Sequence, residues 1–321
     1  MWPYEKNFPY HSNIDLNADF DRIADEKLKK QGVKRKSKSR AGLDYYRLQQ
    51  RLVENKPRIV KKSRDFSCPQ GYEKALKLIE KVIEQGKNIH PFMTRNLKNL
   101  RNEDLLLSDW GIYHLHLSDE TDDKKRDGFM KRSDKLLMVR IDKNCVYFIT
   151  VVSHNKKNLW TLKRYIQIIR DNWPETIEKY RLQDVKAVEH ISEDKHTLAR
   201  KKHALTITEL EDGTCYMLLG GGYASDGSSI TAVRMYDTFM EQLQDAEKVL
   251  RNNLCKQSDL REWMEKEAEI PASAPLHIHL MKIRDKSFLM IEEKSRLWIQ
   301  MKLENEGWII TASSTLEKIY V

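Results

Sequence analysis

Three histidines are the residues of this chain best suited to chemistry near neutral pH. His114 and His116 are two positions apart in a segment, residues 112–117, where apolar and polar residues alternate as in a half-buried strand. Side chains two apart on a strand project to the same face, and His154 ends a second expected strand. Three imidazoles in this arrangement suit general acid–base catalysis or a zinc site. Alternatively, they are ordinary polar residues on a solvent-facing surface.

Basic side chains surround these histidines. They are Lys131, Arg132, Arg140, Lys156, Lys157, Lys163 and Arg164. Phosphodiester cleavage needs one group to take a proton, another to give one, and cations to stabilise the extra charge. We therefore expect Arg140 to act in catalysis with the histidines, and Arg132, Lys156 and Lys157 to bind substrate. The alternative is a sheet edge protected by solvated lysines.

Two further groups of residues are expected to contact a nucleic acid. Tyr113 and Tyr147 are candidates to stack on the bases of single-stranded RNA. The chain carries 57 Lys+Arg against 48 Asp+Glu, and its first 66 residues hold 17 and 9 of these, a net charge of +8. Lys36 and Arg40 in this basic segment are candidate phosphate contacts; the alternative is a flexible segment without a specific partner.

Other motifs predict no additional chemistry. The glycine-rich run 220–229 lacks the lysine of a phosphate-binding loop and is interpreted as a turn between strands. His277 and His279 are interpreted as structural. The four cysteines are far apart and form no CxxC pair, which argues against a zinc ribbon, a redox motif or a disulfide scaffold. No pair of acidic residues has the spacing of a metal-dependent nuclease, so no cofactor is expected unless the three histidines bind zinc.

The hydrophobic patterning predicts an α+β fold. After a basic N-terminal arm, we expect helices at 70–85 and 91–105, strands at 112–117, 135–141 and 145–153, and a helix at 159–172. The last two strands form a hairpin through Asp142-Lys143-Asn144. A second unit then follows, with a hairpin at 204–219, a strand near 230–233 and a helix at 236–252. The tail from 276 alternates as a small antiparallel meander.

These elements suggest four segments and a compartment. The segments are a partly disordered or helical basic arm (1–66), an α+β domain with the candidate site (67–182), a hairpin with a helix (190–256) and a meander (271–321). A charged stretch at 182–202 and a proline-containing stretch at 268–275 are expected linkers. No apolar run approaches the ~18 residues of a membrane span, and the N-terminus lacks the order of a secretory signal. We therefore expect a cytoplasmic protein without a membrane partner.

The stretch from Lys135 to His154 (KLLMVRIDKNCVYFITVVSH) resembles the core of RelE-like ribonuclease toxins of bacterial toxin–antitoxin systems. The resemblance covers about residues 70–180. It implies a helical pair before an antiparallel sheet, and metal-independent cleavage of RNA, often messenger RNA on the ribosome, in a defence or stress-response role. The family's functional positions carry over to Arg140, His154 and Lys156, and loosely to Tyr147.

Three functional hypotheses follow. The first is a metal-independent endoribonuclease of toxin or phage-defence type, in which His154 and one of His114 or His116 act as base and acid. RNA is then the substrate, and an antitoxin or other protein binds the C-terminal β regions. The second is a non-enzymatic nucleic-acid or protein-binding module of a multi-component defence system. The third is a zinc-dependent hydrolase that uses His114, His116 and His154.

Overall fold

The computed structural model describes residues 13–36, 38–125, 127–185, 190–254, 258–271, 274–284 and 286–315, and it confirms the α+β fold. The chain divides into two compact units. The larger unit contains residues 32–39 and 43–234, and the smaller unit contains residues 1–31, 40–42 and 235–321. This division differs from the four consecutive segments expected from the sequence, because residues close to the two ends of the chain share one core.

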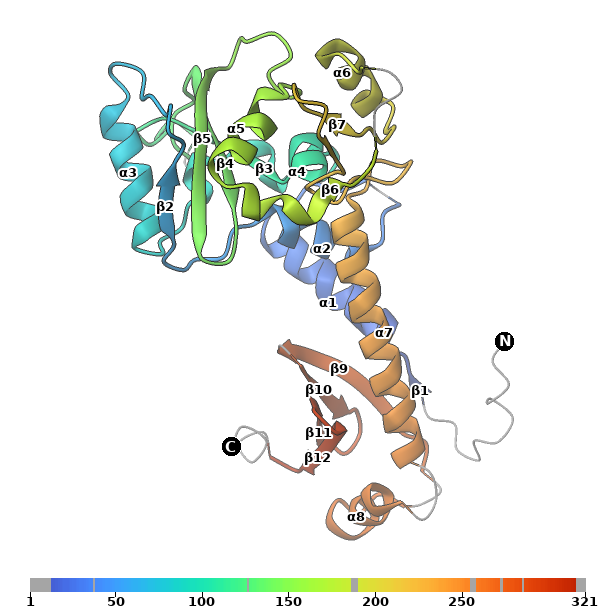
Figure 1. The fold of residues 1–321 in the computed structure, drawn as a ribbon. Helices are drawn as coiled ribbons and strands as arrows, with labels where there is room; N and C mark the ends of the chain where they lie inside the picture. Colours follow the sequence, from blue (N-terminus) through green and yellow to red (C-terminus); the bar gives the residue numbers. More distant parts are fainter. Residues whose placement is uncertain are drawn as a thin grey trace. The chain divides into compact units, whose positions relative to one another are not determined.

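A four-stranded sheet forms the centre of the larger unit (Figure 1). Its order is β2 (Ile59–Lys62), β5 (Cys145–Ser153), β4 (Lys135–Ile141) and β3 (Ile112–His116). The predicted hairpin is confirmed, since β4 and β5 pair antiparallel. Asp142 closes its turn by accepting hydrogen bonds from the backbone nitrogens of the two residues after Lys143. Strand β2 pairs parallel with β5 and was not predicted, because IVKK is too short and too charged to show a period.

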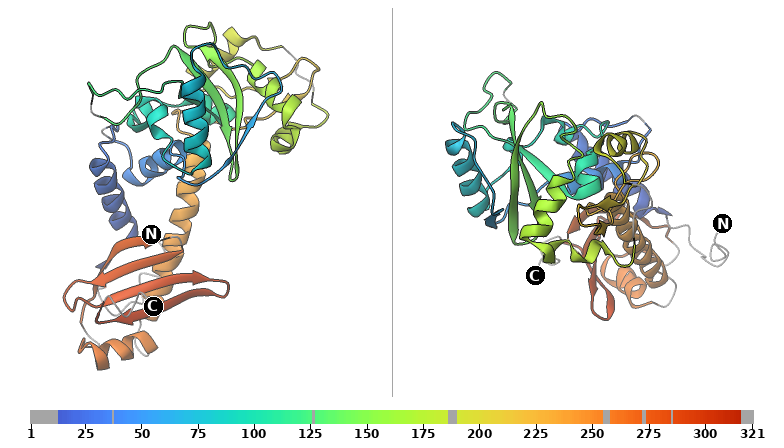
Figure 2. Two further views of the ribbon diagram at one scale, coloured as in Figure 1. Left: turned by 90° about the vertical axis from the view of Figure 1, so that its left-hand side faces the viewer. Right: turned by 45° about the horizontal axis from the view of Figure 1, so that its top comes forward.

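Both faces of this sheet are covered by helices (Figures 1 and 2). Helix α3 (Glu73–Glu84) buries Leu76, Ile79 and Ile83 in the core on one face, as the helical spacing predicts. Helix α5 (Arg164–Asn172) belongs to the core on the other face. The alternating residues of β3, β4 and β5 therefore point to two separate apolar layers.

The expected second helix of the pair, at 91–105, is wrong. The chain there forms two 3-10 turns, η2 (His90–Phe92) and η3 (Arg95–Lys98), before the short helix α4 (Leu105–Trp110). Thr94 caps η3 with its side chain, and the polar residues from 94 to 104 favour turns over a continuous helix. Asp104 then caps α4 by accepting a hydrogen bond from Leu107 N, and Gly111 ends it at φ 65°.

The remainder of the larger unit contains short elements. They are most of α2 (Ala41–Arg51), η4 (Pro174–Thr176), η5 (Glu178–Tyr180), β6 (Arg181–Leu182), α6 (Glu193–Lys201), β7 (Thr208–Glu209) and β8 (Cys215–Tyr216). The expected hairpin is present in short form, with β7 and β8 antiparallel and β6 on the other side of β8. The expected linker at 182–202 contains helix α6, and the expected strand at 230–233 is the start of α7 (Ile230–Asn253). Both assignments were wrong.

The smaller unit contains the C-terminal antiparallel meander (Figure 2). Its strands are β9 (His277–Arg284), β10 (Ser287–Glu292), β11 (Trp298–Glu304) and β12 (Gly307–Ser313), and the two-residue β1 (Asn13–Ile14) adds parallel to β9. Helix α1 (Leu16–Lys30) contacts β9, and α7 and α8 (Asp259–Glu267) complete the unit. None of the helices in the part of the chain that the structure describes is long and apolar enough to cross a membrane.

The described part of residues 1–66 does not form a separate arm. Helix α1 buries Leu16, Phe20 and Ile23 in the smaller unit, where the Phe20 and Phe239 ring centroids are 4.5 Å apart. Helix α2 and strand β2 lie mostly in the larger unit. The apolar residues spaced between the charges therefore give this segment a buried face. The net charge of +8 had instead suggested a basic arm. Residues 1–12 of the expected arm lie outside the described residues.

Candidate active site

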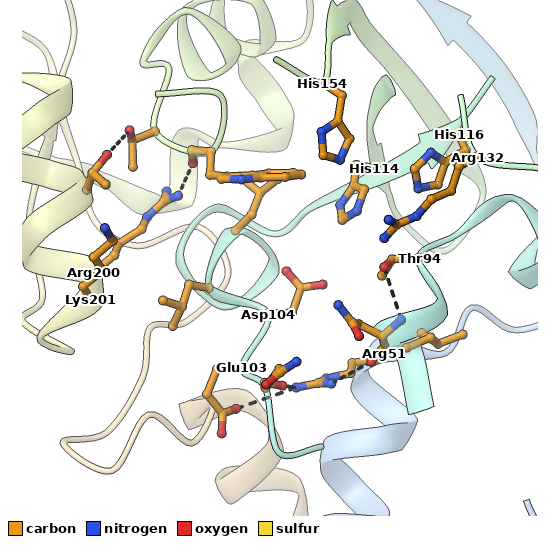
Figure 3. Close-up of a pocket in the computed structure, with 18 residues that line it drawn as sticks. Arg51, Thr94, Glu103, Asp104, His114, His116, Arg132, His154, Arg200 and Lys201 are labelled. Carbon is orange, nitrogen blue, oxygen red and sulfur yellow. Dashed lines mark hydrogen bonds and ion pairs between the residues drawn. The ribbon is translucent and has the colours of Figure 1, made fainter. Parts of the chain in front are cut away.

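The three histidines singled out from the sequence lie together in the larger unit (Figure 3). The ring centroids of His114 and His116 are 6.3 Å apart, and those of His116 and His154 are also 6.3 Å apart. His114 and His116 occupy alternate positions of β3, and His154 directly follows β5. The expectation that one strand face presents His114 and His116 beside His154 is confirmed.

A β-bulge in β5 brings His154 to this face. Met138 pairs with Thr150 and Val139 with Phe148, so Ile149 has no opposite residue on β4. Tyr147 and Ile149, at odd-numbered positions, belong to the core on the α5 side of the sheet. Beyond the bulge, Val152, at an even-numbered position, belongs to the same core. The extra residue changes the phase of the alternation. His154, two residues after Val152, therefore lies on the same face as His116, whose β4 partner Leu136 pairs with Val152.

Burial keeps two of the imidazoles neutral at pH 7. Burial lowers the pKa of His116 to about 4, with further lowering by the charges of His114, Arg132 and His154. Its side chain is almost fully enclosed, since the residue is 5% exposed. Burial also lowers the pKa of His114, while the negative charge of Asp104 opposes that effect. Figure 3 shows Asp104 facing the histidine cluster across the cavity.

The histidines line a cavity of about 450 Å³. Its walls come from the α2–α4 segment, from β3, from the chain on both sides of the β4–β5 hairpin and from α6. Its polar and aromatic lining includes Arg51, Thr94, Asn96, Asn102, Glu103, Asp104, His114, His116, Arg132, His154, Trp160, Thr161, Thr197, Arg200 and Lys201. This size and mixed lining are typical of a site for a small ligand or one residue of a polymer.

Arg132 is the predicted substrate-binding residue that the structure places in this cavity (Figure 3). It is exposed, and no carboxylate among the described residues lies within ion-pair distance of it. Its charge contributes to the low pKa of His116, which also shows that the two groups are near each other. A cation without a carboxylate partner beside neutral imidazoles suits an anionic ligand.

Arg140 does not reach the cavity, which corrects its predicted catalytic placement. It pairs with Ile112 at the far end of β3 from His116. Its guanidinium donates to the carbonyl oxygens of Trp110 and Thr176, at 3.4 Å each. Arg140 therefore joins α4 to the turn after α5.

The two tyrosines expected to stack on bases also lie elsewhere. Tyr147 is buried, its ring packs 4.9 Å from Trp173, and its hydroxyl donates to Asp142 at 2.9 Å. Tyr113 points to the opposite face of β3 from the histidines, and its hydroxyl donates to Gln50 O at 3.0 Å. Burial raises the pKa of both hydroxyls. Apolar neighbours cover both rings, Tyr147 on the α5 side of the sheet and Tyr113 on the α3 side.

The remaining predicted substrate contacts do not line the cavity. Lys156 and Lys157 are exposed in the turn after His154, and Lys157 pairs with Asp194 at 3.2 Å. Lys36 lies 3.8 Å from the carboxylate of Glu103. Arg40 is exposed and belongs to the other unit. None of these four side chains lines the cavity with the histidines.

Helix α6 supplies site residues that the sequence analysis missed. Asp109, at the end of α4, accepts hydrogen bonds from Arg200 Nε and from His196 Nε2, the latter at 2.8 Å. The Arg200 guanidinium lies 4.3 Å from the Trp110 ring centroid. The sequence does contain a signal for this helix. Ser192 caps α6, acidic residues follow in its first turn, and His196 and Arg200 are four residues apart on one helical face.

The triple glycine supports the same region, as its interpretation as a turn suggested. Gly220 N donates to Asp109 O at 2.8 Å and Gly222 N to Ser108 O at 2.8 Å. A Cβ on Gly220 would lie 2.1 Å from Leu107 O. The glycines therefore allow one backbone to approach another closely. They hold the end of α4, where Asp109 lies.

Among the residues that the structure describes, no group of three or more His, Cys, Asp or Glu side chains is placed to hold a metal ion. Cys68, Cys145 and Cys215 are free thiols; Cys255 lies outside the described residues. Comparisons with protein-family models, with curated proteins and with solved structures find no match to this chain. Its function is therefore argued from the geometry of the cavity.

Proposed function

We propose that the chain is a metal-independent endoribonuclease that uses imidazoles as general base and acid. The observation that carries the proposal is the convergence of His114, His116 and His154 with Arg132 on one cavity. RNA supplies its own nucleophile, the ribose 2′-hydroxyl, so a proton acceptor, a proton donor and a cation suffice for cleavage.

The proposed reaction assigns a role to each of these groups. His114, kept neutral by its lowered pKa, accepts the proton of the 2′-hydroxyl as that oxygen attacks the adjacent phosphorus. The bond from phosphorus to the 5′-oxygen breaks, and protonated His154 donates its proton to that oxygen. The products are a 2′,3′-cyclic phosphate and a 5′-hydroxyl. His154 is assigned the acid role because it is the exposed member of the three histidines.

Arg132 and His116 support this step in different ways. Arg132 neutralises the charge that grows on the phosphate oxygens in the transition state. The ring centroid of His116 is 6.3 Å from that of each of the other two histidines, and its Nδ1 is 3.4 Å from Ser133 O. Since its pKa is about 4, it stays neutral beside the base and the acid and adds no charge.

The wider role remains part of the proposal. A ribonuclease of this kind acts as a toxin or in phage defence when an antitoxin or another protein restrains it. The antiparallel strands of the smaller unit are the surface we assign to such a partner. The exposed lysines after His154 and the positive net charge of +9 favour attraction of RNA before it reaches the cavity.

The test is cleavage of a mixed RNA pool by the purified full chain, by His114→Ala and by His154→Ala, with and without EDTA. We expect wild-type cleavage to survive EDTA, and each substitution to reduce the rate by about 10²–10⁴-fold because it removes one proton-transfer group. His190→Ala is the matched control, since this exposed histidine lies outside the cavity. Circular dichroism verifies that all variants are folded.

Each outcome decides between the hypotheses. Cleavage that EDTA abolishes supports a zinc-dependent hydrolase and contradicts the proposal. RNA binding without cleavage, in free solution and with translating ribosomes, supports a binding module instead. Loss of activity in His190→Ala to the same degree as in His154→Ala also contradicts a specific role of the cavity.

A further inference from the structure

Trp160 is a large aromatic side chain that stays exposed at the cavity. It is 39% exposed, although protein folding normally buries rings of this size. Its ring centroid is 4.9 Å from that of His114 and 6.3 Å from that of His154. An exposed indole at this distance from the proposed base and acid provides a flat apolar surface beside the reacting phosphate.

Two cations lie on the α6 side of the cavity (Figure 3). Arg200 is 3% exposed and donates from its Nε to Asp109, while its buried Nη2 has no hydrogen-bond partner among the described residues. Lys201, the next residue, is exposed, and no carboxylate among the described residues lies within ion-pair distance of it. A buried guanidinium nitrogen without a partner costs free energy, which an anionic oxygen bound in the cavity would recover.

Trp160 connects these cations to the histidines. Its backbone carbonyl accepts a hydrogen bond from Arg200 Nη1, and its ring contacts His114. The hydroxyls of Thr161 and Thr197, which hydrogen-bond to each other at 2.8 Å, line the cavity at the same end. A cationic group, an aromatic ring and the acid–base pair therefore follow one another along a single wall.

We propose that this wall binds one nucleotide of single-stranded RNA next to the bond that is cut, with its base stacked on Trp160 and its phosphate held by Arg200 and Lys201. The inference rests on the proposed function in one respect, the position of the bond that is cut. A cavity of about 450 Å³ accommodates one unstacked nucleotide and excludes a duplex. Stacking on an aromatic ring combined with a backbone phosphate contact is how proteins hold single strands without reading their sequence.

Binding is measured first, because it does not depend on cleavage. The probe is a fluorescent, fully 2′-O-methylated single-stranded RNA octamer, whose sugars lack the attacking hydroxyl, titrated into the full chain at several salt concentrations. We expect Trp160→Ala to weaken binding about 5- to 150-fold, the loss of one base-stacking contact, and Trp160→Phe to retain most of the affinity. Lys201→Ala should lower the slope of log affinity against log salt by about 0.7.

Lys202→Ala is the matched control, because Lys202 is an exposed neighbour that does not line the cavity. A duplex of the same 2′-O-methyl sequence should bind equally to wild type and to Trp160→Ala. With cleavable substrates, Trp160→Ala should raise KM for a tetranucleotide and for a dinucleotide, because both contain the stacked base. Lys201→Ala should raise KM for the tetranucleotide alone, because a dinucleotide lacks the neighbouring phosphate.

The outcomes separate this inference from the proposed ribonuclease activity. If the octamer binds with the expected dependence on Trp160 and Lys201 but no RNA is cut, the binding wall stands and the enzyme proposal fails. If RNA is cut while Trp160→Ala and Lys201→Ala bind and cleave long substrates like wild type, the enzyme proposal stands and this inference is wrong. Equal weakening by Lys201→Ala and Lys202→Ala also overturns it, since only general charge then matters.

Discussion

At the scale of single residues, the site depends on imidazoles that burial holds in the neutral state. His116 is the clearest case, because its pKa of about 4 lies well below the ordinary value of about 6.5. The groups facing it are His114, His154 and Arg132, all of which disfavour a positive charge on its ring. The same burial that suits His114 to accept a proton therefore makes the folded state sensitive to acid.

This sensitivity predicts a specific pH dependence of stability. Between pH 6.5 and pH 4 the unfolded chain protonates His116 and the folded protein does not, so stability falls as the pH is lowered. The loss attributable to His116 is about 3 kcal/mol across that window. His116→Gln should therefore lose less stability than wild type between pH 6.5 and pH 4.5 in urea titrations.

His90, whose pKa burial also lowers, remains in both proteins and contributes equally, because it is not among the groups that shift the pKa of His116. The comparison thus isolates His116 together with its interaction with His114. Identical pH dependence in wild type and His116→Gln would show that His116 is not neutral in the folded protein.

At the scale of elements, the loop of Gly220, Gly221 and Gly222 positions the end of α4. A Cβ on Gly220 would lie within 2.7 Å of three backbone atoms, Leu107 O, Ser108 O and Gly111 N. Gly220→Ala should therefore destabilise the protein by about 2–3 kcal/mol, because backbone and not a flexible side chain must shift. It should also reduce RNA cleavage, since Asp109 and its partner Arg200 move with α4.

Gly213→Ala is the comparison for this prediction. A Cβ there meets nothing within 4 Å, so only its positive φ of 80° opposes the substitution, at a cost of about 1 kcal/mol. Thermal unfolding and cleavage by the folded fraction are measured for both. Equal effects of the two substitutions on cleavage would contradict a role for the close approach at Gly220.

Some elements were predictable from the sequence and others were not, for identifiable reasons. Helix α3, the β4–β5 hairpin and the meander have strong periodicity, and local pattern was sufficient for them. The shared face of His114 and His116 was also predictable, from alternation in β3, whereas the face on which His154 lies depends on the bulge in β5. Helix α6 was mistaken for a linker because its exposed side is densely charged, and its buried His196 and Arg200 are themselves polar. The positions of Arg140 and Tyr147 were predicted wrongly. They depend on the end of the sheet where Arg140 lies and on the side of the sheet that Tyr147 faces, and local sequence pattern does not contain that information.

At the scale of the whole molecule, the two units have separate cores, and the cavity is lined by residues of the larger unit alone. Ile299 and Leu136 are both fully buried, the first in the smaller unit and the second beside His116 on β4. Each change to alanine should cost about 2–5 kcal/mol of local stability. At a temperature where both variants are folded, Leu136→Ala should reduce cleavage and Ile299→Ala should not.

Calorimetry reports the stability of each variant, and cleavage of a short RNA reports the site. A short substrate is needed because a long one also contacts surfaces outside the cavity. An equal loss of cleavage in the two variants would mean that the smaller unit takes part in the reaction itself.

The bulge at Ile149 has a consequence for the inheritance of this site. The phase of β5 beyond Thr150 is set by one extra amino acid, and that phase decides which side of the sheet receives His154. If the same sequence paired regularly, without the bulge, Ser153 would face His116 and His154 would turn away from it, with every histidine still encoded. A relative with the same residues at these positions would therefore present His154 to the cavity only if its β5 also formed the bulge.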